Sequence, residues 1–249
     1  MGSSIAEAGG FAPARVTTDV GDILDYGPAI PDYLDDVYWC YYVKPWAIKL
    51  YERPWLVNLI LWGWYHGLSD AAVEAMGPSL TGKSVQIACA YGGLTNQLAE
   101  RVPEGSQLDV VDVVEGQLRN MRSKLPAGAR VRALRMDSSD LKVPDATYDR
   151  ALLFFLLHEM PRDVRTATLK EAMRVVKPGG KIVLIEFAPC AFWHPLKYLW
   201  HLPLRVLEPF AHDIWTRPME HWLPECYHGK KIKKTFYFGR FYQRVEIEV

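Results

Sequence analysis

The sequence predicts an α/β fold in which a parallel sheet carries helices on both faces. Three observations support this prediction. Short apolar segments typical of strands alternate with segments of helical period, a glycine turn follows the first of these strands, and 49% of the residues are hydrophobic against 23% charged. Such alternation implies right-handed crossovers between parallel strands. We expect strands at residues 84–88, 107–112, 131–136, 148–154 and 181–187, and helices at residues 95–101, 116–124 and 163–176.

The segments on either side of this core differ from it in composition. The N-terminal segment is rich in Gly, Ala and Pro with weak periodicity. The next segment is dense in Tyr and Trp, and Pro45 and Pro54 are placed to begin helices. A later segment mixes Pro, Trp and His without a clean period. We therefore expect a mobile arm (1–32), an aromatic helical cover (33–80), the core (81–189), a substrate or membrane cap (190–229) and a closing β-hairpin (230–249).

Composition excludes some classes of protein. The formal net charge is +0, which gives no case for a nucleic-acid partner. The four cysteines form no Cys-x-x-Cys pair, as is typical of reduced thiols in an intracellular protein. Residues 1–20 lack an apolar signal core, and no run reaches the ~18 apolar residues that span a bilayer. We therefore expect a cytoplasmic protein.

Residues 85–93, Val-Gln-Ile-Ala-Cys-Ala-Tyr-Gly-Gly, form a glycine loop of the kind that follows the first strand of nucleoside-binding folds. Ile87 stands where we expect an acidic residue, and Cys89 and Tyr91 stand where glycines are common. A helix N-terminus after such a turn offers N–H groups, and the glycine pair permits a close approach. Cofactor contacts are expected from Ala88, Cys89, Ala90, Gly92 and Gly93. A glycine pair alone is equally consistent with a plain turn.

Two further strand ends carry acidic residues. Asp112 ends the second strand, where a carboxylate can accept hydrogen bonds from both ribose hydroxyls. Asp137 and Ser138 end the third strand, where the carboxylate can accept from an adenine amino group and the Ser138 N–H can donate to a ring nitrogen. Because these strand ends meet at one edge of the sheet, we expect a nucleoside site that includes Val113 and Phe154. Asp112 taken alone could instead cap a helix.

The ordered motifs resemble those of class I S-adenosylmethionine-dependent methyltransferases, especially the branch that serves ubiquinone and menaquinone biosynthesis. The resemblance implies a Rossmann-like class I methyltransferase fold that binds S-adenosylmethionine, with an N-terminal helical cover and a C-terminal cap insertion. It is carried by residues 108–112 (Leu-Asp-Val-Val-Asp), 136–141 (Met-Asp-Ser-Ser-Asp-Leu), 147–149 (Thr-Tyr-Asp), 156–160 (Leu-Leu-His-Glu-Met) and 174–180 (Arg-Val-Val-Lys-Pro-Gly-Gly).

A longer resemblance extends over nearly the whole chain beyond about residue 30. The sequence is similar to the family of rhodoquinone-biosynthesis proteins, which are divergent members of the methyltransferase superfamily. That family replaces a ring methoxy group of ubiquinone by an amino group, with S-adenosylmethionine as amino donor and manganese(II) as cofactor. The resemblance therefore implies ubiquinone as substrate. It is carried by residues 38–39, 45–46, 52–53, 55–63, 88–92, 153–159, 193–195 and 207–210.

Ile87 gives the implied amination a chemical rationale. A quinone ring accepts nucleophiles, so the amine of the cofactor must attack it, and an amine does so only as the free base. A neighbouring carboxylate would hold the amine as ammonium, and Ile87 removes that charge. A divalent ion close by would act in the same direction. The competing interpretation is that Ile87 simply fills a central strand.

Four residues are candidates for catalysis. Tyr91 in the glycine loop could orient the amine or a quinone oxygen, and Tyr65 could close over the methionine end of the cofactor. For both, packing is the alternative. His158 and Glu159 follow the fourth strand, and either could transfer a proton when methoxide leaves. A structural pair at the strand end is the alternative for these two.

The ligands of a manganese ion are harder to predict. Manganese prefers oxygen ligands, and no pair of histidines has the i, i+4 spacing of a helical metal site. The weak candidates are Asp137, Asp140, Glu159 and His158.

Two segments have the composition of an amphipathic face that lies on a membrane. The apolar tail of ubiquinone requires a route to the bilayer, and residues 54–65 and 192–215 are suited to it. Lysines within residues 230–234 could meet anionic headgroups, or could merely solvate an edge strand. We expect peripheral attachment to a bacterial or mitochondrial inner membrane.

The first functional expectation is amino transfer from S-adenosylmethionine to ubiquinone. Two alternatives remain open. One is an ordinary quinone or phenol O- or C-methyltransferase, and the other is a non-catalytic accessory protein that binds a quinone.

Overall fold

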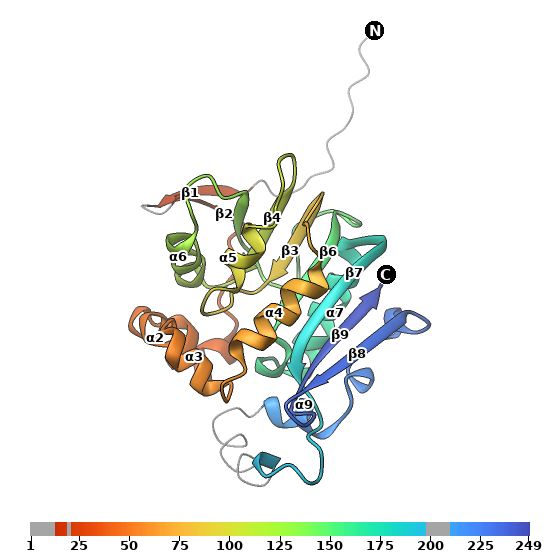
Figure 1. Ribbon diagram of the computed structural model, residues 1–249. Coiled ribbons are helices and arrows are strands. Elements are labelled where there is room, and N and C mark those ends of the chain that lie inside the picture. Colours follow the sequence, from red (N-terminus) through yellow and green to blue (C-terminus); the bar gives the residue numbers. More distant parts are fainter. Residues whose placement is uncertain (1–12, 19–20, 198–209) are drawn as a thin grey trace.

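The computed structural model describes residues 13–18, 21–197 and 210–249. The strands in this part of the chain are β1 (Ala14–Thr18), β2 (Gly21–Asp25), β3 (Lys83–Ile87), β4 (Gln107–Asp112), β5 (Val131–Arg135), β6 (Tyr148–Phe154), β7 (Val176–Phe187), β8 (Lys231–Tyr237) and β9 (Tyr242–Glu248). They form one sheet in the order β1-β2-β5-β4-β3-β6-β7-β9-β8 (Figure 1). The neighbours from β2 to β7 are parallel, and the pairs at both ends of the sheet are antiparallel.

The five predicted core strands are confirmed as β3 to β7, and the closing hairpin is β8–β9. The largest difference in bounds is at β7, which begins at Val176 instead of Lys181. Its pairing with β6 explains this difference. Tyr148 pairs with Val176 and Arg150 pairs with Lys181, so residues 177–180 bulge out of the ladder. The predicted Pro-Gly-Gly turn therefore lies inside the strand.

The expectation of a mobile arm is wrong for the part of residues 1–32 that forms β1 and β2. β2 pairs in parallel with β5, and Ile23 is fully buried in the main core. The Arg135 guanidinium holds the Asp25 carboxylate at 2.9 Å. β1 and β2 have five residues each, and in β2 only Ile23 is buried. Strands this short have too weak a periodicity to be predicted from the sequence. Residues 1–12 and 19–20 lie outside the described part.

Helices cover both faces of the sheet, as predicted. α4 (Tyr65–Met76), α5 (Leu94–Ala99) and α6 (Glu115–Lys124) lie on one face, and α7 (Arg162–Val175) lies on the other (Figure 1). α4 contacts β6, β7 and β9, and α7 contacts β7. Both helices therefore pack on β7, from opposite faces of the sheet.

The predicted aromatic cover consists of short helices. They are α1 (Asp32–Asp36), a π-helix η1 (Trp39–Val43), α2 (Pro45–Tyr51) and α3 (Pro54–Ile60). Pro45 and Pro54 each occupy the first position of a helix, where a missing N–H costs no hydrogen bond. Beyond the core, the described part of the cap contains α9 (Ala211–Thr216), η3 (Met219–His221) and η4 (Glu225–Tyr227). Residues 198–209 of the expected cap lie outside the described part.

Membrane-spanning helices were not expected. Among the described residues, no helix has the length and apolar character needed to cross a bilayer.

Candidate active site

A cavity of about 440 Å³ lies at the carboxyl ends of β3, β4, β5 and β6. β3 is the point where the chain order of the sheet reverses, because β4 pairs with one side of it and β6 with the other. Ligands of open α/β sheets bind at such a crevice. The predicted site residues on its wall are Tyr65, Ala88, Cys89, Ala90, Tyr91, Asp112, Val113, Asp137, Ser138, Phe154, His158 and Glu159. Gly92, Gly93 and Asp140 do not belong to this wall.

Position 92 requires a glycine because the Tyr65 side chain lies directly against its backbone. Its φ is +80°, and a Cβ at this position would lie 2.4 Å from the Tyr65 hydroxyl oxygen. The Tyr65 hydroxyl donates to the Tyr91 carbonyl at 3.0 Å and accepts from the Leu94 N–H at 3.2 Å. The close approach expected from a ligand is therefore made by Tyr65, and the Tyr65 hydroxyl is engaged in holding the loop.

Ile87 does not face the cavity. Its side chain is fully buried in the main core, which agrees with the alternative that it fills a central strand. Successive residues of a strand point to opposite faces, and the preceding residue, Gln86, holds the loop instead. Its amide donates to the Ala88 carbonyl at 3.0 Å and accepts from the Thr95 hydroxyl at 3.0 Å. The hypothesis that Ile87 removes the charge next to the cofactor amine is wrong in its choice of residue, because the neutral side chain behind the glycine loop is Gln86.

Glu52, which the sequence analysis missed, supplies a carboxylate to the loop from the cover. It accepts from the Gly92 N–H at 3.0 Å and from Asn120 at 2.6 Å, and it pairs with Lys124 at 2.8 Å. Lys124 also donates to the Gly92 carbonyl at 2.8 Å. Glu52 is the sole acidic residue in residues 37–69, and that isolation in an apolar segment was the signal available in the sequence.

Asp112 is held at the base of the cavity by backbone N–H groups. It accepts from the Cys89 N–H and from the Val114 N–H, each at 2.8 Å. Burial raises the pKa of Asp112 to about 6, although these hydrogen bonds act to lower it. Burial next to Asp112 also raises the pKa of the Cys89 thiol, which therefore stays neutral. The Cys89 thiol and the Val113 N–H also form hydrogen bonds with this carboxylate.

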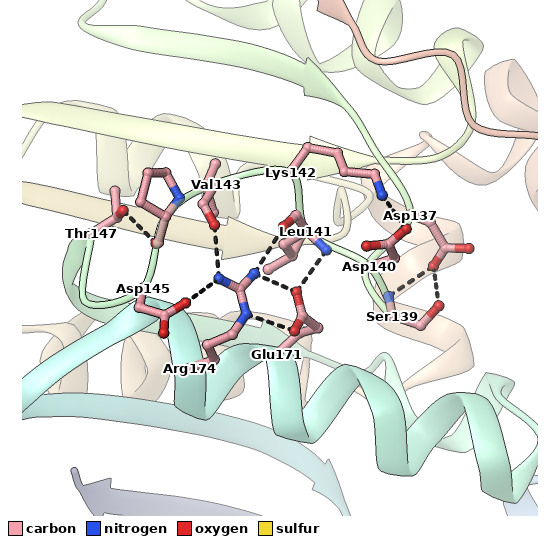
Figure 2. Close-up of polar contacts among 11 residues, drawn as sticks. Asp137, Ser139, Asp140, Leu141, Lys142, Val143, Asp145, Thr147, Glu171 and Arg174 are labelled. Carbon is pink, nitrogen blue, oxygen red and sulfur yellow. Dashed lines mark hydrogen bonds and ion pairs between the residues drawn. The ribbon is translucent and has the colours of Figure 1, made fainter. Parts of the chain in front are cut away.

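Asp137 begins a loop that is fixed rigidly against α7. Its carboxylate accepts from the Ser139 N–H at 2.8 Å and from the Ser139 hydroxyl at 2.7 Å, and Asp140 pairs with Lys142 (Figure 2). Asp140 does not line the cavity. Figure 2 also shows the Arg174 guanidinium that holds the loop against α7. It donates to Glu171, Asp145 and the carbonyls of Leu141 and Val143. The strand-end position of Asp137 is thereby fixed before any ligand binds.

His158 and a buried carboxylate form a pair at the end of β6. His158 Nδ1 lies 2.9 Å from Glu186 Oε1, and Glu186 is 1% exposed. Glu186 also accepts from the N–H groups of Leu157, His158 and Phe187. Because a carboxylate accepts, Nδ1 carries the proton, and the lone pair of a neutral imidazole lies on Nε2. Glu186, at the end of β7, was missed although it is an acidic residue at a strand end.

Glu159 faces the same cavity. His158 Nε2 lies 3.8 Å from Glu159 Oε1, and the Tyr42 hydroxyl donates to that same oxygen. Glu159 therefore connects His158, at the strand ends, to Tyr42 of the cover.

Tyrosines of the cover form the opposite wall of the cavity. The Tyr91 ring is stacked on Tyr42 at 5.8 Å and on Tyr51 at 6.2 Å. The Tyr91 hydroxyl donates to the Tyr41 carbonyl at 2.5 Å and accepts from Gln117 at 2.7 Å. Burial raises the pKa of Tyr91 far above its ordinary value. These contacts favour the packing alternative for Tyr91.

The residues present do not fit a manganese site. Among the described residues, no three His, Cys, Asp or Glu side chains are grouped so that they could hold a metal ion. Of the four candidates, Asp140 is paired with Lys142 outside the cavity, and His158 is engaged through Nδ1 by Glu186.

Fold and site together define the class I S-adenosylmethionine-dependent methyltransferase fold, as predicted. Residues 85–180 match the family described as "Methyltransferase domain". A solved S-adenosylmethionine-dependent methyltransferase from Aquifex aeolicus shares the fold with a TM-score of 0.53, at 18% identity, over 82% of this chain and 97% of that one.

The sequence relatives are named as methyltransferases of ubiquinone and menaquinone biosynthesis. The chain is 32% identical to the ubiquinone/menaquinone biosynthesis C-methyltransferase UbiE of Bordetella avium, over 63% of this chain and 66% of the relative. It is 26% identical to the demethylmenaquinone methyltransferase of Bacillus licheniformis, over 63% of this chain and 67% of the relative. Across the relatives compared, the chain spans 46% to 67% of their length.

Proposed function

We propose that this chain is an S-adenosylmethionine-dependent transferase that modifies the ring of a lipid quinone. The observation that carries the proposal is the arrangement of the cavity, which places the strand-end acids Asp112 and Asp137 on the same wall as the buried His158–Glu186 pair. The first two suit a nucleoside and the pair suits proton transfer. The named activities of the relatives supply the substrate class.

The nucleoside part of the cofactor would lie along the strand ends. Asp112 is suited to accept from the ribose hydroxyls, and the Ser138 N–H lies where it can donate to the adenine ring. A sulfonium centre would then lie towards the loop at Ala88 and Ala90, on the way to His158. This orientation is part of the proposal.

Methyl transfer to the reduced ring is the reaction that the relatives favour. A quinol oxygen or ring carbon attacks the methyl carbon, the bond between that carbon and sulfur breaks, and S-adenosylhomocysteine is left. The proton of the quinol passes to His158 Nε2, while Glu186 holds Nδ1 as the donor. Glu186 is a positioning residue in this reaction.

Amination of ubiquinone is the second candidate, and two observations favour it. The group behind the glycine loop is the neutral Gln86, and the aromatic cover that carries the longer family resemblance lies outside the matched residues 85–180. The cofactor nitrogen would add to the methoxy-bearing carbon and give up a proton to His158, which returns it to the departing methoxide as methanol. Elimination would then break the bond between the nitrogen and the methionine Cα: a proton moves from Cβ to the nitrogen, a double bond forms between Cα and Cβ, and the amine stays on the ring.

One labelling experiment separates the candidates. The purified chain is incubated with ubiquinone or its quinol and with S-adenosylmethionine labelled either in the methyl carbon or in the amine nitrogen, with and without manganese(II). Mass spectrometry of the quinone follows each label. Carbon in the product identifies methyl transfer, and nitrogen identifies amination. Cofactor binding without either label identifies a non-catalytic protein and contradicts the proposal.

A further inference from the structure

The outward sides of α2 and α3 expose large apolar side chains. Trp46 is 55% exposed, Trp55 is 60% exposed and Leu59 is 63% exposed, and Leu50 is exposed as well. A spacing of four residues places Trp46 and Leu50 on one side of α2, and Trp55 and Leu59 on one side of α3. We call these four residues the apolar face. Large apolar side chains grouped in this way mark contact with another apolar phase.

The exposed charges on α2 and α3, and on the residues that precede these helices, have one sign. Lys44, Lys49 and Arg53 are exposed on the same two helices or next to them. Glu52, the sole acid in residues 37–69, points inward to Lys124 and the Gly92 N–H. The outward side of this segment is therefore cationic, which is complementary to an anionic lipid surface.

The apolar face is continuous with the cavity through α3. Leu56, Val57, Ile60 and Leu61 lie on the cavity wall. Ile60 is also 47% exposed, so the same side chain contacts both the cavity and the solvent. An apolar path therefore leads from the candidate active site to the surface of α3.

We propose that the apolar face docks on an anionic bilayer, so that a quinone ring enters the cavity along α3 while its apolar tail stays in the lipid. Amphipathic surfaces with Trp and Leu on one side and Lys or Arg beside them bind the headgroup region in this way. The docking itself rests on the face and its charge. The entry of a quinone rests on the proposed function.

The docking is tested by sedimentation of the full chain with phosphatidylcholine vesicles that contain or lack phosphatidylglycerol. The chain is expected to bind the anionic vesicles more tightly. Trp55→Ser combined with Leu59→Ser is expected to lower that binding by about tenfold or more. Phe236→Ser is the matched control, because Phe236 is 38% exposed on β8, in the hairpin on the other side of the molecule (Figure 1). Its binding should equal that of the parent.

The charge requirement has its own variant. Lys49→Gln combined with Arg53→Gln should reduce the preference for anionic vesicles by roughly fivefold for each charge removed. Thermal unfolding of every variant at the parent midpoint shows that the fold is intact. Failure of the parent to bind, or equal binding by the parent and the Trp55/Leu59 variant, overturns the proposal. A parent dimer that the same variant dissociates assigns the face to a second copy and also overturns it.

Turnover separates the docking from the proposed function. With a short-chain quinone in solution, the Trp55/Leu59 variant should work at the parent rate, because neither residue lies on the cavity wall. With a long-chain quinone in anionic vesicles, its rate should fall in proportion to binding. Vesicle binding without turnover of either quinone would support the docking and contradict the proposed function. An equal loss of rate with both quinones would contradict the proposed route along α3.

Discussion

The two walls of the cavity are held in different ways. On the strand-end wall, Asp112 and Asp137 accept from backbone N–H groups, and His158 is held by a buried carboxylate. On the cover wall, Tyr42 stacks on Tyr91 of the glycine loop. The Tyr91 hydroxyl donates to the Tyr41 carbonyl, and Gln117 donates to the Tyr42 carbonyl. The first wall lies almost wholly within residues 85–180, which match the methyltransferase domain family, and the second wall lies mostly outside them.

This difference separates two tasks. The strand-end wall has fixed polar groups suited to a nucleoside and to proton transfer, and the cover wall is aromatic and neutral. Burial, together with the nearby Asp137 and Glu159, raises the pKa of Tyr33 far above its ordinary value. The proposed function assigns the cofactor and the proton transfer to the strand-end wall, and it leaves the cover wall to face the second substrate. Four predictions test this division.

The largest effect is expected from His158→Gln. The variant should keep the affinity for S-adenosylmethionine and lose about 10²- to 10⁴-fold in turnover, because it removes the group that moves the proton. Asp140→Asn is the control, since Asp140 is exposed outside the cavity, and it should change neither quantity. Single-turnover kinetics and calorimetric titration measure the two quantities. Turnover above a tenth of the parent rate would remove His158 from this role.

Asp112→Asn should weaken cofactor binding by roughly 10- to 100-fold, as expected for the loss of hydrogen bonds to a charged group. The parent should also bind less tightly as the pH falls through about 6, because the carboxylate then takes up a proton. The effect on folding has the opposite sign. Because the pKa of Asp112 is higher in the folded state than in the unfolded state, its contribution to the free energy of unfolding falls as the pH rises from the unfolded pKa to about 6. An affinity that is independent of pH in the parent would contradict this assignment.

Glu52→Gln tests the connection between the walls. It removes the charge that pairs with Lys124 and keeps an oxygen that can accept from the Gly92 N–H, so the free energy of unfolding should fall by about 1 to 2 kcal/mol. Chemical denaturation measures it, with Glu115→Gln, whose ion pair with Arg119 is exposed, as the nearly neutral control. Equal losses in both variants would show that Glu52 contributes no more than a surface charge.

Tyr91→Phe should have the smallest effect. It removes one hydroxyl that bonds Tyr41 and Gln117 and keeps the stacked ring, so we expect about 1 kcal/mol of lost stability and turnover within a few-fold of the parent. Denaturation and steady-state kinetics measure both. A loss of turnover comparable to that of His158→Gln would restore a catalytic role for the hydroxyl.

The strand-end wall was predictable because its positions follow from local patterns. Each of Asp112, Asp137 and His158 follows an apolar segment of strand length, and parallel strands bring such ends together. The sequence analysis placed the neutral side chain at Ile87, one residue after Gln86, which is the residue that lies behind the loop. A shift of one residue along a strand exchanges the two faces, so a loop motif fixes the neighbourhood of a side chain more securely than its direction.

The cover contacts could not be predicted in the same way. Glu52 reaches Gly92 across 40 residues of sequence, and Tyr42 reaches Glu159 across 117. Nothing in the local period of either segment sets such a pairing, because it depends on how short helices pack on the finished sheet. The β1–β2 pair was missed for the same reason, since β2 is stabilised by a partner strand that lies far along the chain.

The position of β2 has a consequence for how the cover can move. The segment that forms the cover is anchored before it begins, by β2 on β5 and by Arg135, which also donates to the Pro28 carbonyl, and again after it ends, by α4 on the sheet. A chain that is tethered at both ends explores fewer conformations than a chain with one free end. Removal of the first 26 residues should therefore loosen the start of the cover while leaving the strand-end acids in place.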